Sequence, residues 1–343
     1  MKRIIGIWAA LVVALSGSAQ TAPGDPGPKG AARRNAAQTA GQPAPELRFR
    51  SDGRFRIMQL TDLHYTESER QSGHVLPMVA ELIEREKPDL IVLTGDVIYA
   101  RNAEKLLRRI GGFLHKQGVP YAVTLGNHDA EQGLTRAEVY DIVRTLPGCV
   151  NARYNPAGER QGDFVIPLAA TDGSCAAALY VMDSNDYNAD DHSYAGLEAE
   201  QVAWYVRQSE ALEARCGRKV NALVFLHIPL PEYREAFDGD PQAVGFRLEK
   251  ESPGRDNRGM FEAMVRRGDV AGVFAGHDHA NNYIALKEGI ALGYGRYSGG
   301  FAEYQELLSG ARMIELRQDR TGFATWERLA NGREMRRTVF PRQ

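Results

Sequence analysis

The 343-residue chain has few cysteines, little net charge and only one long apolar run, and each shortage narrows its possible functions. Cys149, Cys175 and Cys216 show none of the spacings that cysteine-based metal sites have. Their odd number leaves at least one thiol unpaired. One disulfide could form in an oxidising compartment, but the sequence does not select the pair. A net charge of −2 gives no electrostatic signal for nucleic acid or for an anionic membrane.

The apolar run lies at the N-terminus and has the parts of a secretory signal. Lys2 and Arg3 precede the apolar residues 4–15, and Gly17-Ser18-Ala19 offers a small-residue cleavage site. We therefore expect a signal peptide over residues 1–19 and a secreted or periplasmic protein. The run is too short for a permanent membrane anchor, and no cysteine follows it for lipid attachment. The alternative is a buried N-terminal helix.

Residues 20–46 are rich in Ala, Gly and Pro and contain few large apolar side chains. Such a segment buries too little surface to offset the entropy lost on ordering, so we expect a disordered linker. A single folded domain is expected over residues 47–340. No internal repeat is visible.

Strand-like and helix-like patterns alternate through this domain. Helical periodicity is present at 75–85, 103–116, 135–146, 199–214 and 260–266, and the third of these begins with a capping box, Thr135 and Glu138. Apolar runs typical of strands cover 55–60, 90–93, 121–125, 176–182, 220–226 and 270–275. Residues 147–174 are less regular, and the segments after residue 284 alternate like antiparallel strands. The pattern predicts an α/β layered core, with the terminal strands suggesting a second sheet packed on the first.

The apolar runs end in polar clusters, and five of the eight histidines lie in them. Open α/β sheets carry their chemistry at the carboxyl ends of strands. Imidazole, carboxylate and amide donors together suit Fe, Mn, Zn or Co better than Mg or Ca. Seven donors besides His128 are enough for two metals that share one carboxylate. The clusters are Gly126-Asn127-His128-Asp129, Thr61-Asp62-Leu63-His64, Gly95-Asp96, His227 and Gly276-His277-Asp278-His279.

In order and spacing, these clusters resemble the full motif set of the calcineurin-like metallophosphoesterases, over residues 55–294. The flanking sequences are similar to a purple acid phosphatase-like branch of that family. The resemblance implies an α/β fold, a four-layer α/β/β/α sandwich of two mixed sheets. The flanking segments that carry it are Met182-Asp183-Ser184, Leu226 to Tyr233, Asn257-Arg258-Gly259 and Gly276 to Asn282.

The resemblance also implies a role for each residue of the clusters. Asp62, His64 and His279 would hold the first of two transition metal ions (Fe, Mn or Zn), Asn127, His227 and His277 the second, and Asp96 would bridge them. His128 would protonate or hydrogen-bond the leaving oxygen, and Asp129 would orient His128. A hydroxide bridging the two metals would attack phosphorus.

Tyr99 marks a departure from the family's purple enzymes. Those enzymes have Gly where His64 stands, and they use a Tyr three residues after the bridging Asp as a ligand to ferric iron. Tyr99 stands three residues after Asp96. Because His64 already supplies a ligand to the first metal, we expect Tyr99 not to bind metal. Iron specifically is therefore not implied.

Four residues near the clusters are candidates for substrate contact: Asn185, Tyr233, Asn257 and Asn282. Tyr233 follows His227 on a segment that Pro229 and Pro231 would stiffen into a loop over the metals. Turn formation is the alternative role for Asn282, and capping of the next segment is the alternative for Asn185.

These features predict an enzyme acting on a small-molecule phosphoester, in the first place a phosphomonoesterase. One alternative is a phosphodiesterase acting on nucleotides or lipid head groups. A basic pocket rim or an aromatic clamp would favour nucleotides, and the sequence identifies neither. Another alternative is a binding scaffold that has lost its chemistry, which the presence of all seven donors and His128 disfavours. The sequence does not indicate an oligomeric state.

Overall fold

The short apolar runs form strands whose alternate side chains are buried on opposite faces of a sheet. The computed structural model describes residues 46–156, 160–301 and 308–342. In β2 (Leu90–Thr94) every residue is buried. Leu90 and Val92 join one apolar cluster, whereas Ile91 and Leu93 join another. A strand covered on both faces appears in the sequence as an unbroken apolar run.

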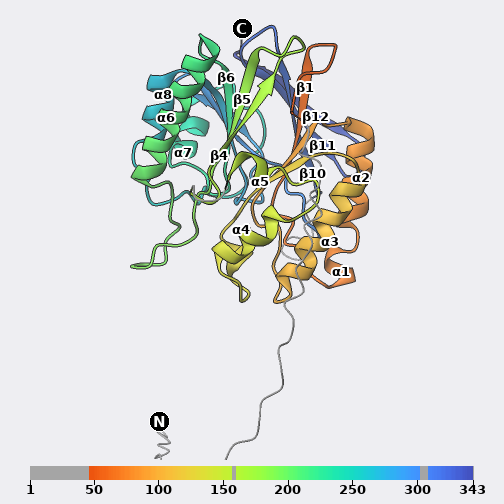
Figure 1. Ribbon diagram of the computed structural model, residues 1–343. Helices are drawn as coiled ribbons and strands as arrows, with labels where there is room; N and C mark the ends of the chain where they lie inside the picture. Colours follow the sequence, from red (N-terminus) through yellow and green to blue (C-terminus); the bar gives the residue numbers. More distant parts are fainter. Residues whose placement is uncertain (1–45, 157–159, 302–307, 343) are drawn as a thin grey trace, which may run out of the picture. The chain divides into compact units, whose positions relative to one another are not determined.

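Two mixed sheets of six strands each form the centre of the fold (Figure 1). In the first sheet β1, β2 and β3 are parallel, and in the second β5, β6, β7 and β9 are parallel. The first sheet has the order β12 (Glu334–Phe340), β11 (Phe323–Leu329), β10 (Gly310–Arg317), β1 (Arg54–Leu60), β2 and β3 (Tyr121–Thr124). The second has the order β4 (Phe164–Ala169), β5 (Cys175–Val181), β6 (Asn221–Phe225), β7 (Val270–Ala275), β9 (Ile290–Tyr294) and β8 (Ile284–Lys287).

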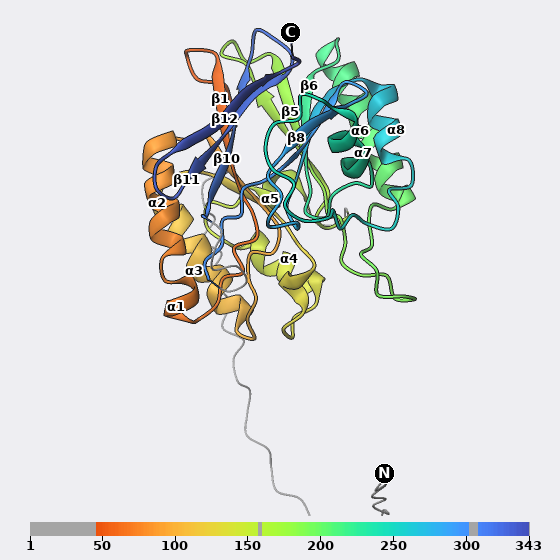
Figure 2. The same cartoon turned by 180° about the vertical axis from the view of Figure 1, so that it is seen from behind.

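Helices cover the outer face of each sheet, as the two opposite views show (Figures 1 and 2). Those on the first sheet are α2 (Val75–Glu86), α3 (Ala103–Lys116) and α4 (Arg136–Arg144), and those on the second are α6 (Ala199–Cys216), α7 (Glu232–Gly239) and α8 (Met260–Arg267). Short turns of helix complete the elements of the described residues: α1 (Glu69–Ser72), η1 (His128–Ala130) and α5 (Asn151–Tyr154). Three apolar clusters fill the three interfaces between these layers. The predicted four-layer α/β/β/α sandwich is confirmed.

The sequence assigned only part of the C-terminal strands to the correct sheet. We expected the segments after residue 284 to form a second sheet, and β8 and β9 do pair antiparallel within it. However, β10 pairs with β1, and β11 and β12 extend the first sheet. The second sheet is built around β5, β6 and β7 instead. Periodicity shows which residues form a strand, whereas its neighbour is chosen by packing over long separations.

Besides the short turns α1 and α5, two elements were missed for local reasons. β4 lies in the section expected to be irregular and contains Pro167. Because β4 is an edge strand that pairs only with β5, the absent N–H of Pro167 is tolerated. α7 occupies the segment expected to be a stiff loop. It starts directly after Pro231, because a proline ring is already set for the first turn of a helix.

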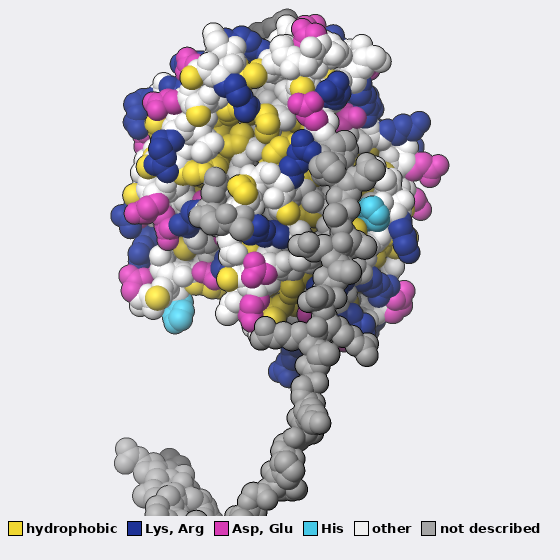
Figure 3. Space-filling view, in the orientation of Figure 1, with side chains coloured by type: hydrophobic (Ala, Val, Ile, Leu, Met, Phe, Trp, Pro, Cys, Tyr) yellow, Lys and Arg dark blue, Asp and Glu magenta, His cyan; other side chains and the backbone are white. Residues whose placement is uncertain are grey.

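The expected signal peptide at 1–19 and nearly all of the expected linker at 20–46 lie outside the described residues. The described residues all belong to one unit, Gln42–Gln343. Over residues 46–156, 160–301 and 308–342, no helix is both long and apolar enough to cross a membrane. On the face drawn in Figure 3, basic and acidic side chains are interspersed.

One disulfide joins Cys175 at the start of β5 to Cys216 at the end of α6. It therefore links the second sheet to its covering helix. Cys149 is the free cysteine, and burial raises the pKa of its thiol to about 12. A thiol with so high a pKa is unreactive.

Candidate metal centre

The polar clusters meet because they follow parallel strands. Parallel strands end at the same edge of a sheet, so the residues after β1, β2 and β3 come together, as do those after β6 and β7. Leu125 and Leu226, the residues that continue β3 and β6, are fully buried, so each cluster begins where a rigid strand leaves the core. The ends of β1, β2 and β3 in the first sheet face the ends of β6 and β7 in the second sheet across the sheet–sheet interface.

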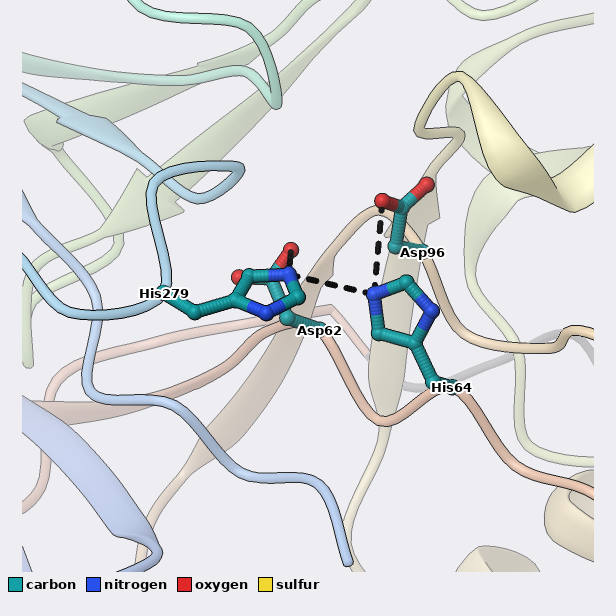
Figure 4. A group of neighbouring side chains, drawn as sticks. All are labelled: Asp62, His64, Asp96 and His279. Atoms are coloured by element: carbon teal, nitrogen blue, oxygen red, sulfur yellow. Dashed lines mark hydrogen bonds and ion pairs between the residues drawn. The ribbon is translucent and has the colours of Figure 1, made fainter. Parts of the chain in front are cut away.

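One group of potential ligands consists of Asp62, His64, Asp96 and His279 (Figure 4). The donor atoms of the four residues lie within 4.8 Å of one another. His64 Nε2 is 3.1 Å from His279 Nε2 and 3.6 Å from Asp96 Oδ2, and His279 Nε2 is 3.4 Å from Asp62 Oδ1. Two imidazole nitrogens, each roughly 2.1 Å from a common ion, would be roughly 3 Å apart.

A second group contains Asp96, His227 and His277. His227 Nε2 is 3.2 Å from Asp96 Oδ2 and 3.2 Å from Asn127 Oδ1, so the Asn127 amide oxygen faces the same space. The other nitrogen, His227 Nδ1, is 2.8 Å from the Thr94 carbonyl oxygen and donates to it. This bond leaves His227 Nε2 as the nitrogen that faces the cluster. Asp96 belongs to both groups.

The backbone at these positions is held in an unusual conformation. Asp62, His64, Asp96 and His277 all have positive φ angles, at 55°, 41°, 49° and 77°. Each such residue costs of order 1–3 kcal/mol, and clusters of them are typical of functional sites. Gly126 permits the close approach of the β2 and β3 ends, because a Cβ there would lie 2.0 Å from Asp96 Oδ1.

Burial and neighbouring charges determine the protonation of the site in the absence of metal. Burial opposes charge on Asp96, but the neighbouring His227 outweighs it and holds the pKa of the carboxyl well below its usual range. For His227 burial is likewise outweighed by Asp96, which raises the pKa of the imidazole to about 9. Burial and the adjacent His227 lower the pKa of His277 to about 3.

The residues fit a dinuclear metal centre. His277 Nε2 is buried and has no hydrogen-bond partner among the described residues. A neutral buried imidazole with an unsatisfied nitrogen is costly unless that nitrogen binds an ion. The donors are nitrogen and oxygen, which suits a first-row transition metal. A shared carboxylate between two such groups is the arrangement that two neighbouring ions require.

His128 lies beside the first group, but its expected partner is different. Its ring is 5.3 Å from that of His64 and 5.4 Å from that of Tyr99, measured between centroids. We expected Asp129 to orient this ring. Asp129 instead accepts backbone hydrogen bonds from Val97, Ile98 and Gly126, at 2.8–3.0 Å.

Asp129 therefore joins the end of β3 to the loop after β2. Burial and the nearby Asp96 charge raise its pKa to about 6. The residue within hydrogen-bond distance of the His128 ring is Glu131, whose Oε2 is 2.7 Å from Nδ1. The expectation for Asp129 is corrected accordingly, because its carboxylate is already committed to three backbone N–H groups.

The four candidate substrate contacts have other partners. Tyr233 is wholly buried under the second sheet and donates to the carbonyl oxygens of Val273 and Gly293. Its expected place over the metals is wrong, because the segment is helix α7 and this side chain lies on its buried face.

The three asparagines hold loops in place. Asn257 donates to Glu232, and Asn282 accepts from the Phe246 N–H and donates to Glu327. Asn185 donates to the Gly196 carbonyl oxygen and has φ of 61°, a turn conformation. These hydrogen bonds therefore give the three asparagines a role in holding turns and loops, and not in contacting substrate.

Besides Glu131, two residues of the site were missed at the level of sequence. Tyr187 donates to Glu131 Oε1 and accepts from Asn127 Nδ2, both at 2.8 Å. Tyr194 packs its ring edge-on against His277, with centroids 4.3 Å apart. Both tyrosines follow β5 on a loop, and no local pattern marks such residues. One indication of them was present in the sequence: Met182-Asp183-Ser184 ends a strand at the edge where the polar clusters gather, so the loop that follows begins near the site.

A buried carboxyl, Asp163, anchors the start of this loop. It accepts hydrogen bonds from the Asp183 N–H at 2.9 Å and from Gln201 Nε2 at 3.0 Å. Burial, together with the neighbouring Asp183 charge, raises the pKa of Asp163 to about 7. Below this pH the folded protein holds a proton on Asp163 that the unfolded chain releases above about pH 4.

We expect Asp163 to make the protein less stable as pH rises from about 4 to about 7. Over this window the folded state binds more protons than the unfolded state, so the free energy of unfolding falls, by a few kcal/mol at most. Asp163→Asn keeps an acceptor oxygen but cannot titrate. Urea unfolding across pH 4–8 would measure the free energy of unfolding of both proteins. The difference between wild type and Asp163→Asn should change between about pH 4 and about pH 7. Asp141→Asn on α4 is the exposed control, and a pH-independent difference for Asp163→Asn would contradict the prediction.

Comparison with known proteins agrees with this geometry. The family model for calcineurin-like phosphoesterases matches residues 55–281, which contain every potential ligand described above. The chain belongs to the calcineurin-like phosphoesterase family. The predicted family is thereby confirmed, and its purple acid phosphatase-like character rests on the relatives.

One such relative is the "probable inactive purple acid phosphatase 29" of Arabidopsis thaliana. It is 30% identical over 332 residues, covering 83% of this chain and 84% of that protein. A dimetal phosphatase from Danio rerio has a similar structure, with a TM-score of 0.59 and 13% identity over 83% of this chain and 98% of that one. The purple acid phosphatase PPD1 of yellow lupin follows, with a TM-score of 0.53 and 14% identity over 87% of this chain and 54% of that one. At such low identity these structures support the fold alone.

Proposed function

We propose that the protein is a dinuclear-metal phosphoesterase acting chiefly on phosphomonoesters. The observation that carries the proposal is the position of Asp96. Its Oδ2 lies 3.6 Å from His64 Nε2 and 3.2 Å from His227 Nε2, so one carboxylate oxygen serves both ligand groups. Asp62, His64 and His279 would hold one ion with Asp96, and Asn127, His227 and His277 the other.

Two bound ions would stabilise the attacking and leaving oxygens of an in-line displacement and activate a water molecule. The protein itself positions the ligands and the candidate general acid, His128. Asp96 Oδ1 accepts from the His128 N–H at 2.9 Å, which fixes the acid candidate to the residue shared by both groups. His128 is also partly exposed, with 29% of its side chain accessible, so a substrate oxygen can reach it. We infer that His128 assists the leaving oxygen.

Export is part of the proposal. The apparent signal peptide motivates it, and the Cys175–Cys216 disulfide supports it. Disulfides persist in oxidising compartments such as the periplasm and the extracellular space. Detection of the processed protein outside the cytoplasm, with a new N-terminus near residue 20, would test this part separately.

Phosphodiesterase activity is the second candidate, and one pocket favours it. A pocket of about 580 Å³ is lined by Tyr187 and Tyr194, which contact Asn127 and His277 of the second ligand group. Its charged lining is mixed, with Arg234, Lys250 and Arg255 beside Asp191 and Glu251. The two tyrosine rings stack 5.6 Å apart. The aromatic pair suits a flat group on the far side of a phosphodiester.

The proposal predicts about two metal ions per chain and hydrolysis that depends on His128. Purified protein loaded with Mn, Zn or Fe would be assayed with p-nitrophenyl phosphate and bis-p-nitrophenyl phosphate. His128→Ala should lower kcat by about 10²–10⁴-fold, because it removes a general acid, while leaving the metal content unchanged. His115→Ala on the exposed side of α3 is the control.

The preferred ester decides between monoesterase and diesterase activity. Failure to bind metal under any loading would overturn the proposed mechanism and favour a binding scaffold. Hydrolysis that is unaffected by His128→Ala would overturn the role proposed for His128.

A further inference from the structure

Four side chains form a hydrogen-bonded relay between the second ligand group and the acid candidate. Asn127 Nδ2 donates to the Tyr187 hydroxyl at 2.8 Å, and that hydroxyl donates to Glu131 Oε1 at 2.8 Å. The other carboxylate oxygen, Glu131 Oε2, is 2.7 Å from His128 Nδ1. Asn127 and His128 are neighbours in sequence, so the relay is a closed loop. We call Asn127, Tyr187, Glu131 and His128 the Glu131 relay.

The Glu131 carboxylate determines which partner donates and which accepts in each hydrogen bond of the relay. An ionised carboxylate can only accept hydrogen bonds. The Tyr187 hydroxyl must therefore give its proton to Glu131, which leaves it able only to accept from Asn127. The Asn127 amide must in turn present its NH₂ to Tyr187. Its carbonyl oxygen then points the other way, toward His227 Nε2 at 3.2 Å.

The same constraint applies to His128. A carboxylate 2.7 Å from Nδ1 requires the proton on Nδ1. The opposite nitrogen, Nε2, is then the one that faces a leaving oxygen, and it donates to that oxygen when the ring also carries a proton on Nε2. An asparagine and a histidine each have two orientations that differ little in shape, and only hydrogen bonding selects between them.

We propose that Glu131 is a positioning residue that sets both choices at once. It orients the Asn127 amide so that the carbonyl oxygen faces the second metal position, and it holds the His128 ring at Nδ1–H so that, in the imidazolium form, the proton on Nε2 is the one directed at substrate. This inference rests on the proposed function for the part that concerns His128. Tyr187 is the link that carries the effect to Asn127.

The surroundings suit a positioning role. Glu131 is partly exposed, with 29% of its side chain accessible, so it lies on the rim and not in the core. Tyr187 is supported by its stack on Tyr194, whose ring packs edge-on against His277. The relay thus spans the loop after β3 and the loop after β5, the two segments that border the second ligand group.

Two variants separate the two effects. Tyr187→Phe removes the link to Asn127 but leaves the bond between Glu131 and His128. We expect binding of the second equivalent of Mn²⁺, measured by calorimetric titration, to weaken by about 10–100-fold, as when an outer partner of a ligand is lost. Glu131→Ala should weaken it similarly. The double variant should be no worse than Glu131→Ala alone, because both changes break one connection.

Only Glu131→Ala should change the leaving-group dependence of hydrolysis. A general acid matters most when the leaving oxygen is basic. We expect its loss of kcat to be about tenfold larger on phenyl phosphate than on p-nitrophenyl phosphate. Tyr187→Phe should lose equally on both substrates once metal is saturating. A purely structural defect would lower both rates alike.

Glu84→Ala, on the exposed face of α2, is the matched control and should leave every readout at the wild-type value. Unchanged Mn²⁺ binding in both relay variants would overturn the Asn127 part. A leaving-group dependence in Glu131→Ala that parallels wild type would overturn the His128 part. If wild type binds two Mn²⁺ but hydrolyses neither ester, the proposed function fails on its own. The ¹⁵N shifts of His128 then decide its tautomer: a proton on Nδ1 that Glu131→Ala removes supports the relay, and any other result overturns it.

Discussion

Asp96→Asn is expected to remove both metal ions and, with them, phosphoesterase activity. Asp96 Oδ1 accepts from the His128 N–H at 2.9 Å, while Oδ2 faces His64 and His227. An asparagine that keeps the bond to His128 must turn its NH₂ group toward both imidazoles. An NH₂ group cannot bind a metal, so both ligand groups lose their shared donor at once. The loss should exceed the about 100-fold typical of an outer partner.

Metal analysis and steady-state kinetics at saturating Mn²⁺ would measure this effect. Asp141→Asn, exposed on α4, is the control with the same chemical change. Circular dichroism would show whether the variant keeps its secondary structure, since the amide fills the same space as the carboxylate. A variant that retains two ions per chain would show that Asp96 does not bridge them.

Removal of the Cys175–Cys216 disulfide should cause the largest loss of stability. The bond closes a loop with a sequence separation of 41 residues and links β5 to the last residue of α6. Restricting such a loop in the unfolded chain corresponds to about 4 kcal/mol in the chain-entropy model. We expect Cys175→Ala with Cys216→Ala to lower the free energy of unfolding by about 2–4 kcal/mol.

Urea unfolding with and without reductant would test this value. The reductant should destabilise wild type but have no effect on the double variant. Cys149→Ala is the control, since Cys149 forms no disulfide and its removal takes away only a small packed side chain. If the reductant leaves wild type unchanged in urea, the cysteines are not paired in the folded protein.

The relatives named as probable inactive purple acid phosphatases make activity the central question. In this chain the potential ligands of both groups are present and converge, and Asp96 lies between them. An enzyme that had lost its chemistry would not be expected to retain buried carboxylates and imidazoles at positive φ, because each is costly without a function. This argument favours a functional metal site, and the His128→Ala assay decides whether that site is catalytic.

Much of the candidate site could be predicted because it depends on local order. Asp62, Asp96 and His277 each lie two residues after the end of a strand. Parallel pairing of the strands is enough to bring these residues to the same edge of a sheet, so their positions can be predicted from the sequence. The orientation of His128 could not be predicted in the same way. Asp129 is its neighbour in sequence, yet Glu131 is its neighbour in space.

The sequence by itself determined the alternation of strands and helices, the family, and the ends at which polar residues gather. These follow from periodicity and from motifs, which are local properties of the chain. Only the tertiary structure decided which sheet β10 to β12 join, which cysteines pair, and that Tyr187 closes the Glu131 relay. Each of these is a contact between segments far apart in the chain, and such contacts are selected by the packing of whole layers.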